Sequence, residues 1–182
     1  MNIRLIAGLY GGRTIEGSGT ERTHPMSERV RSSLFSIIGS EVEGARVLDV
    51  FAGSGALGLE ALSRGAESAT FVERDRIAQK IIDANITTLG IERKKAKLIK
   101  APASSWARTS GDDTYDIIFA DPPYHDLQLS TVATITSLLK PGGLMVLSYP
   151  DKAEVPTELG VVVVDNRSYG NAALAFYRKE GA

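Results

Sequence analysis

Between residues 45 and 150, short apolar runs alternate with segments that have one apolar face at helical spacing. The apolar runs cover residues 46–50, 68–72, 96–100, 115–120 and 144–148. The helical patterns lie between these runs, near residues 56–64, 76–88, 103–107 and 130–139. Such an alternation is typical of α/β proteins, and it predicts a mostly parallel sheet with helices on both faces.

The start of the chain departs from this alternation. Residues 1–25 are polar and rich in glycine, and two short alternating pieces at 3–6 and 13–16 predict a small hairpin. Ser27 then has the position of an N-cap for a helix with one apolar face. We therefore expect residues 1–40 to form a hairpin-and-helix extension.

The end of the chain also changes character. After Pro150 no further long helical pattern follows, and residues 161–164 and 172–177 are typical of strands. We expect them to form an antiparallel hairpin at one edge of the sheet. Residues 41–182 would then make up the main domain, and we expect the protein to be a monomer.

Cysteine is absent from the 182 residues, and the only histidines are His24 and His125. These counts exclude disulfides, zinc ribbons, cysteine-ligated iron–sulfur clusters and thiolate nucleophiles, and they predict no metal site. The sequence has no signal peptide and no apolar run long enough to cross a membrane, so we expect a cytoplasmic protein without a membrane partner. The net charge is −1, but residues 1–40 hold five arginines against three glutamates.

A glycine-rich loop joins the first predicted strand to the first helix. Gly53, Gly55 and Gly58 follow the pattern G-x-G-x-x-G, which permits a tight turn and a close approach of a ligand to the backbone. Glu73 ends the second strand, where a carboxylate can accept hydrogen bonds from ribose hydroxyls. Asp49, just before the loop, would repel a pyrophosphate and suits a cation instead. The pattern thus predicts a nucleotide-type site, and it argues against a dinucleotide.

Asp49-x-Phe51-x-Gly53-x-Gly55 resembles the motif of class I S-adenosylmethionine-dependent methyltransferases. The resemblance implies a Rossmann-like sheet with S-adenosylmethionine as the cofactor. It implies that Asp49 meets the amino end of the cofactor and that Glu73 holds the ribose. The loop at Ala103 lacks the Asn or Asp that such enzymes often have near the adenine, which would then contact backbone and apolar side chains. The full set of cofactor contacts that we expect is Asp49, Phe51, Ala52, Gly53, Ser54, Gly55, Glu73, Arg74, Ala103 and Asp121.

Asp121-Pro122-Pro123-Tyr124 follows the apolar run at 115–120. Ligands of open α/β sheets bind at the carboxyl ends of the strands, so this tetrapeptide should lie near the glycine loop. Two prolines stiffen the segment and remove two donors, which leaves acceptors for an exocyclic amine, while Tyr124 can stack on a base. We expect all four residues to be catalytic, by orienting the amine and stabilising the developing positive charge.

This tetrapeptide resembles the [D/N]-P-P-[F/Y] signature of amino-methyltransferases, which act on adenine N6, guanine N2 or a glutamine amide. The signature indicates a reaction and leaves the base open. An adenine-N6 methyltransferase of DNA or RNA is therefore an alternative. An NAD(P)-dependent dehydrogenase and a non-enzymatic RNA-binding module are more distant alternatives.

The first forty residues and the C-terminal Tyr169-Gly170-Asn171 resemble the RsmD family, which methylates guanine N2 in bacterial small-subunit (16S) rRNA. The resemblance implies that the partner is this rRNA, within a partly assembled 30S subunit. Where the family usually has Arg-Pro-Thr, this chain has His24-Pro25-Met26. The residues that we expect to contact RNA are Arg4, Tyr10, Arg13, His24, Pro25, Arg29, Arg31 and Tyr124.

Overall fold

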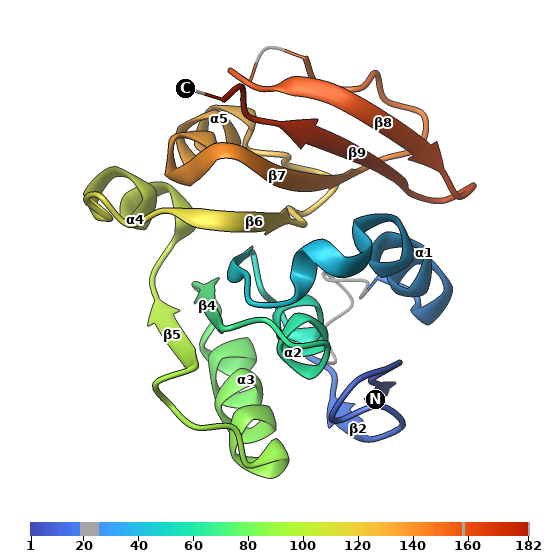
Figure 1. Cartoon of the computed structure of the whole chain (residues 1–182), viewed down its shortest axis with the longest axis vertical. Coiled ribbons are helices and arrows are strands. Elements are labelled where there is room, and N and C mark those ends of the chain that lie inside the picture. The colour runs from blue at the N-terminus through green and yellow to red at the C-terminus, as the bar shows by residue number, and fades with distance from the viewer. Residues whose placement is uncertain (19–25, 158, 182) are drawn as a thin grey trace.

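The computed structural model describes residues 1–18, 26–157 and 159–181. Its main element is a seven-stranded sheet in the order β5-β4-β3-β6-β7-β9-β8 (Figure 1). The strands are β3 (Arg46–Val50), β4 (Ser68–Glu73), β5 (Ala96–Lys100), β6 (Tyr115–Ala120), β7 (Leu139–Tyr149), β8 (Val162–Ser168) and β9 (Ala173–Arg178). Strands β3 to β7 are mutually parallel, and β9 pairs antiparallel with both β7 and β8. The predicted α/β fold class and its C-terminal antiparallel hairpin are confirmed.

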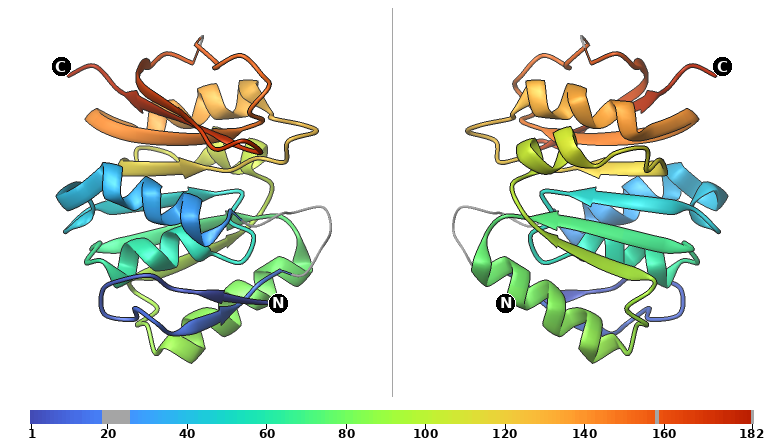
Figure 2. Two further views of the ribbon diagram at one scale, coloured as in Figure 1. Left: turned by 90° about the vertical axis from the view of Figure 1, so that its right-hand side faces the viewer. Right: turned by 90° about the vertical axis from the view of Figure 1, so that its left-hand side faces the viewer.

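Helices cover both faces of this sheet (Figure 2). They are α1 (Glu28–Ile38), α2 (Ala56–Ser63), α3 (Arg76–Leu89), α4 (Ala103–Thr109) and α5 (Leu129–Ile135), with short 3₁₀ turns η1 (Gly39–Val42) and η2 (Thr136–Leu138). Helices α1, α2 and α3 contribute to one apolar core, and α4 and α5 contribute to the other. Successive side chains of a strand point to opposite faces of the sheet, so β3 contributes to both cores: Val47 is part of the first and Leu48 is part of the second.

The direction of the strand order reverses between β3 and β6, and the carboxyl ends of these two strands are called the crevice below. The chain runs outward from β3 through β4 to β5, and then returns to the other side of β3 as β6. Adjacent connections diverge at such a point, and ligands of open α/β sheets bind there, at the carboxyl ends of the strands. Val50 pairs with Ala120, so Phe51 and Asp121 leave the sheet side by side.

The N-terminal segment is packed into the body of the protein. Strands β1 (Asn2–Arg4) and β2 (Thr14–Glu16) form the expected hairpin, with Ile3 opposite Ile15. Both isoleucines are buried in the core that α1, α2 and α3 share. The division of the chain at residue 40 stays a prediction, but the core continues across it.

A buried carboxylate fastens this segment to α2. Glu60 is fully buried and accepts hydrogen bonds from the amides of Ile6 at 2.8 Å and Ala7 at 3.2 Å. Its charge is balanced by Arg64 at 2.8 Å and by Arg31 at 3.5 Å. A buried charge without such partners is strongly unfavourable, so the N-terminal segment and α2 stabilise each other.

Strand β7 begins earlier than the apolar run at 144–148 predicts. Leu139 pairs with Tyr115, whereas Leu144 pairs with Ile117, so residues 140–143 bulge from the ladder. Gly142 adopts a positive φ of 78° in this bulge, and Pro141 has no amide hydrogen for a ladder bond. The helix predicted at 130–139 is correspondingly shorter, and it ends at Ile135 before η2.

Candidate active site

The loop between β3 and α2 holds three residues with positive φ. Gly53 and Gly55 have φ values of 59° and 82°, in the left-handed region that glycine enters readily. Phe51 has φ 62° although it carries a side chain, which is a strained conformation of the kind found at ligand sites. At Gly53 a Cβ would meet no described atom within 4 Å, so open space lies beside this backbone. The loop therefore has an exposed backbone that a ligand can approach.

Gly58 serves packing rather than a turn. A Cβ at this position would lie 2.4 Å from Cε1 of Phe71, so only glycine lets α2 pack this closely on β4. Close packing also brings the Gly58 amide to the Asp49 carboxylate, to which it donates a hydrogen bond of 2.9 Å. Asp49 is 1% exposed, and its burial raises the pKa of its carboxyl well above the usual range. The glycine motif thus holds an acid inside the site.

Glu73 connects the end of β4 to the glycine loop. Its Oε1 accepts a hydrogen bond from the Gly53 amide at 2.9 Å, and its Oε2 accepts one from the Asp75 amide at 2.7 Å. Each carboxylate oxygen has a further lone pair that can accept a bond from a ligand hydroxyl. Glu73 is only partly buried, so a ligand can reach it.

The Asp121-Pro122-Pro123-Tyr124 segment continues from β6 on the other side of this crevice. Loss of surrounding water raises the pKa of Asp121 to about 6, and a hydrogen bond from Ser148 offsets part of this effect. The Tyr124 hydroxyl lies 2.6 Å from Oγ of Ser148, while 40% of the tyrosine stays exposed. The charge of Asp121 in turn contributes to the raised pKa of Asp49. Asp49, Glu73 and Asp121 therefore form one acidic crevice.

The remaining cofactor-site predictions fall on the same edge of the sheet. Ala52 and Ser54 belong to the glycine loop, and both are nearly buried. Arg74 follows Glu73 and is exposed, and Ala103 is the first residue of α4, just beyond the carboxyl end of β5. The structure brings the predicted cofactor residues together at one edge, and their roles remain predictions.

The predicted RNA contacts divide into separate groups. Arg4 and Arg29 border one groove, with a volume of about 520 Å³, that also includes Ile6, Glu28, Ser32, Ser33 and Ser36. The Arg4 guanidinium is paired with Glu28 at 2.8 Å, and Arg29 is exposed. His24 and Pro25 lie outside the described residues.

Three other predicted RNA contacts lie elsewhere. Arg31 is 2% exposed and donates to the Arg4 carbonyl at 3.1 Å, so it is not available to a phosphate at the surface. Arg13 donates to the Thr88 carbonyl at the end of α3, and the Tyr10 amide donates to Ser63 at the end of α2. Helices α2 and α3 start at the crevice and run away from it. Tyr10 and Arg13 therefore lie toward the opposite edge of the sheet, where the parallel strands begin. Local sequence could not show these long-range contacts.

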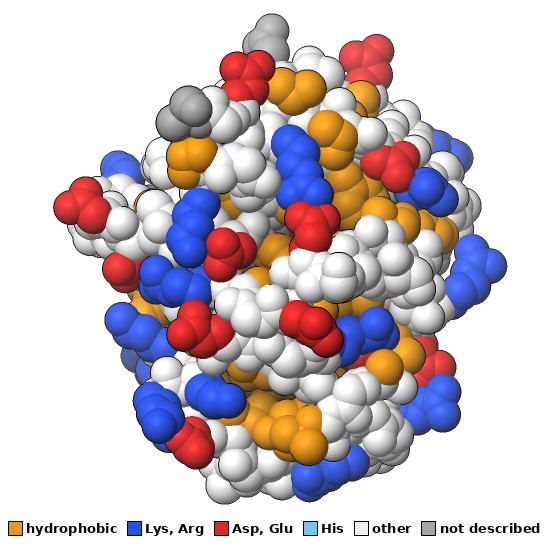
Figure 3. Space-filling view, in the orientation of Figure 1, with side chains coloured by type: hydrophobic (Ala, Val, Ile, Leu, Met, Phe, Trp, Pro, Cys, Tyr) orange, Lys and Arg blue, Asp and Glu red, His pale blue; other side chains and the backbone are white. Residues whose placement is uncertain are grey.

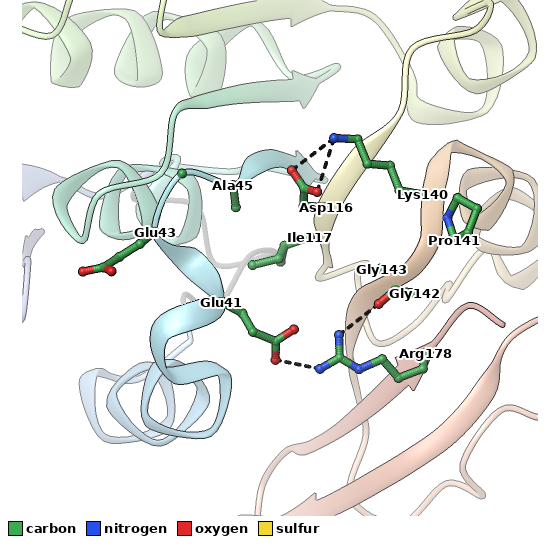
Figure 4. Close-up of a pocket in the computed structure, with 11 residues that line it drawn as sticks. Glu41, Glu43, Ala45, Asp116, Ile117, Lys140, Pro141, Gly142, Gly143 and Arg178 are labelled. Atoms are coloured by element: carbon green, nitrogen blue, oxygen red, sulfur yellow. Dashed lines mark hydrogen bonds and ion pairs between the residues drawn. The ribbon is translucent and has the colours of Figure 1, made fainter. Parts of the chain in front are cut away.

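That opposite edge carries a pocket of its own, with a volume of about 310 Å³ (Figure 4). Four of its charged side chains form two ion pairs, Lys140 with Asp116 at 3.3 Å and Arg178 with Glu41 at 2.6 Å. Both signs of charge are interspersed over this side of the molecule (Figure 3). Within the described residues, no group of three or more His, Cys, Asp or Glu side chains could hold a metal ion. Across the same residues, no helix is long and apolar enough to span a membrane.

Sequence reasoning missed one residue at the crevice. Ser148 contacts Tyr124 from β7 and is 3% exposed. It belongs to no motif, but it is the one polar side chain in the run from Leu144 to Tyr149. A lone hydroxyl in a buried strand needs a partner, and that need is the signal that could have identified it.

The sheet order, the glycine loop after β3 and the Asp-Pro-Pro-Tyr segment after β6 define a class I methyltransferase. The chain belongs to the family described as "Conserved hypothetical protein 95", whose model matches residues 3–178. The resemblance and the enzyme class predicted from the sequence are thereby confirmed.

Relatives and solved structures agree with this assignment. The "Putative rRNA methyltransferase YlbH" of Bacillus subtilis is 34% identical over 185 residues, which cover 98% of this chain and 100% of that protein. "Ribosomal RNA small subunit methyltransferase D" of Escherichia coli is 38% identical over 122 residues, 67% of this chain and 60% of that protein. The solved "Putative methyltransferase yhhF from Escherichia coli" has a TM-score of 0.87 and 30% identity, with 100% of both chains covered.

Proposed function

We propose that this protein transfers a methyl group from S-adenosylmethionine to the exocyclic N2 amine of a guanosine in small-subunit rRNA. One observation carries the proposal: Asp121-Pro122-Pro123-Tyr124 leaves β6 directly beside the glycine loop that leaves β3. A stiff set of acceptors for an amine is thereby placed next to a site for a nucleoside cofactor. The names of the relatives support rRNA as the substrate.

The crevice fits this cofactor by its chemistry. S-adenosylmethionine supplies an electrophilic methyl group on a sulfonium, next to a protonated amine and a ribose. Asp49, Glu73 and Asp121 offer acceptors and negative charge toward such cationic and hydroxyl groups. The same three carboxylates would repel the pyrophosphate of NAD, which disfavours the dehydrogenase alternative.

Asp121 and the proline carbonyls orient the amine. An aryl amine is a poor nucleophile because its lone pair is delocalised into the ring. When the ionised Asp121 and a proline carbonyl accept hydrogen bonds from the two N–H groups of the amine, the nitrogen lone pair is directed toward the methyl donor. The Asp121 carboxylate would stabilise the positive charge that develops on the amine nitrogen when the nitrogen takes the methyl group from the sulfonium and leaves a neutral thioether. One amine proton then leaves, to the carboxylate or to water, and the product is a neutral secondary amine.

The groove between β1 and α1 supports an RNA substrate. Arg29 and the serines Ser32 and Ser36 present donors of the kind that bind phosphate oxygens. Helix α1 begins near the carboxyl edge of the sheet, because it runs antiparallel to β3, which follows it. The protein then acts as a monomer in the cytoplasm, on rRNA within a partly assembled 30S subunit.

Nucleoside mass spectrometry tests the proposal most directly. The small-subunit rRNA of a deletion strain should lose one N2-methylguanosine, and the wild-type gene should restore it whereas Asp121→Ala should not. Loss of N6-methyladenosine instead would support the adenine alternative, and unchanged N2-methylguanosine would refute the substrate. Calorimetry separates the cofactors, since binding of NAD but not of S-adenosylhomocysteine would refute methyl transfer.

A further inference from the structure

We propose that Ser148 is a positioning residue for the methyl-transfer step, because its hydroxyl, fixed in a buried strand, holds the Tyr124 ring at the crevice. The inference rests on the function proposed above and deepens it. It assigns a role to a side chain outside the Asp-Pro-Pro-Tyr motif, on a different strand.

The first observation is geometric. Ser148 Oγ lies 2.6 Å from the Tyr124 hydroxyl, a normal length for a hydrogen bond between two hydroxyls. The Tyr124 side chain is 40% exposed, so packing alone does not fix its ring. The phenol oxygen is the end of the ring farthest from the backbone, and holding it there removes the main freedom of the ring. Ser148 thus fixes the direction in which the Tyr124 ring points, and with it the place where a base can stack.

The second observation concerns the support behind Ser148. Ser148 is 3% exposed and lies in β7, where it pairs with Leu174 of β9. On the other side of β7, Leu147 pairs with Ala120, the residue before Asp121. The serine is therefore fixed by ladders on both sides of its strand, whereas Tyr124 belongs to a loop. A rigid strand that orients a loop residue is the arrangement that a precise site requires.

Hydroxyl chemistry connects the tyrosine to the acid. A serine has one O–H to donate and two lone pairs to accept. Ser148 Oγ bonds the Tyr124 hydroxyl, and the same serine lowers the pKa of Asp121. Ser148 is therefore close to both the stacking ring and the acid.

Removal of the hydroxyl should act on catalysis rather than on cofactor binding. Ser148→Ala leaves the Tyr124 hydroxyl without its partner and frees the ring, and small misplacement of a reacting group costs up to about 100-fold in rate. We expect kcat to fall about tenfold or more, with the affinity for S-adenosylhomocysteine changed less than about twofold. Ser148→Thr keeps the hydroxyl and should restore most of the loss.

The matched control is Ser63→Ala. Ser63 is also a serine that is 3% exposed, and its hydroxyl also bonds within the protein, but it lies at the far end of α2. Both alanine variants should lose similar stability in thermal unfolding, so a kcat loss confined to Ser148→Ala separates positioning from folding. The double variant Tyr124→Phe with Ser148→Ala should be non-additive, because both changes remove the same bond.

A second readout needs neither substrate nor turnover. With ¹³C-labelled aspartate, NMR titration of the free protein follows the Asp121 carboxyl directly. Asp49 at the end of β3 and Tyr124 in its own loop are titratable groups that interact with Asp121, and neither residue is replaced in Ser148→Ala. The variant should titrate at higher pH than the wild type and Ser148→Thr should titrate near it, whereas Ser63→Ala should not shift.

The outcomes are distinct. An unchanged Asp121 titration together with a kcat equal to that of Ser63→Ala would overturn the role of Ser148. A wild-type protein that methylates no rRNA would overturn the proposed function, and the titration would still decide whether Ser148 holds Asp121.

Discussion

The Glu73 carboxylate accepts a hydrogen bond of 2.9 Å from the Gly53 amide, across the gap between β4 and the glycine loop. The same carboxylate accepts the Asp75 amide at 2.7 Å through its other oxygen. Both partners are amide donors, so residue 73 needs a hydrogen-bond acceptor at each of the two terminal atoms of its side chain. The residue that we expect to hold the ribose thereby also holds the loop on which the cofactor would rest.

Glu73→Gln should weaken cofactor binding more than the loss of one ribose contact would. The glutamine side chain has one acceptor oxygen, so its NH₂ group must face the backbone N–H of either Gly53 or Asp75. An unsatisfied or repelled donor costs about 1–3 kcal/mol, which corresponds to an affinity for S-adenosylhomocysteine lower by about 5- to 150-fold. Calorimetry measures it, with the exposed Glu92→Gln as the matched control. Equal affinities in the two variants would contradict the role of Glu73 in the loop.

The turnover rate should rise with pH through about 6. Below that pH Asp121 is protonated, and a protonated carboxyl donates a hydrogen bond where the amine needs an acceptor. Above it the carboxylate can accept from the amine. Measurement of kcat between pH 5 and 8 should show this ascending limb in the wild type. Asp121→Asn should have very low activity at every pH and no such limb.

Asp121→Asn should also stabilise the folded protein at neutral pH. Because the pKa of Asp121 is raised from 3.8 to about 6 in the folded protein, its contribution to stability is fully present below pH 3.8 and is lost as the pH rises through 6. Asparagine avoids the buried charge, so Asp121→Asn should be more stable than the wild type by about 1–3 kcal/mol at pH 7.5. At pH 4 the difference should nearly vanish. Urea unfolding at both values checks the sign, and a variant less stable at pH 7.5 would contradict it.

Gly58→Ala should destabilise the protein and disturb the site together. The new Cβ would meet the Phe71 ring, whose Cε1 lies 2.4 Å from its position, and overpacking of this kind costs about 1–3 kcal/mol. The shift of α2 would also lengthen the Gly58 bond to Asp49. Gly181→Ala is the control, because no described atom lies within 4 Å of its Cβ. Equal unfolding midpoints for the two variants would show that α2 adjusts freely.

Arg29 and Arg31 should respond differently when each is replaced by alanine. Arg29 is exposed in the groove along α1, so its loss should weaken RNA binding and reduce the salt slope by about 1. Arg31 is buried beside Glu60, and removing it leaves Arg64 and two backbone amides as the partners of that carboxylate, at a cost of about 1–3 kcal/mol in stability. Salt-dependent binding and urea unfolding distinguish the two effects. A salt slope that changes only in Arg31→Ala would contradict the burial argument.

The strands and helices of the main sheet could be predicted from the sequence because local periodicity determines them. The apolar run at 115–120 and the helical pattern at 76–88 both reappear within a residue as β6 and α3. The positions of Asp49, Glu73 and Asp121 at the crevice follow from the rule that parallel strands end at one edge.

Contacts between distant segments could not be predicted in this way. Arginine is a residue type that commonly binds phosphate, but Arg31 is paired with the buried Glu60, which lies 29 residues further along the chain. Tyr10 and Arg13 are likewise placed by the far ends of α2 and α3. Ser148 has no motif, and its role depends on Tyr124. Each miss concerns a side chain whose partner is remote in sequence.

The buried Glu60 that fastens Ile6 and Ala7 also has a consequence for the order of folding. During synthesis the first ten residues leave the ribosome long before the carboxylate that binds them, and Asn85, which binds Glu16, follows later still. The hairpin cannot be stable on its own, since two strands alone are marginal in water. The first segment to be made is therefore among the later ones to fold, and until α2 and α3 are complete it stays open to proteases and chaperones.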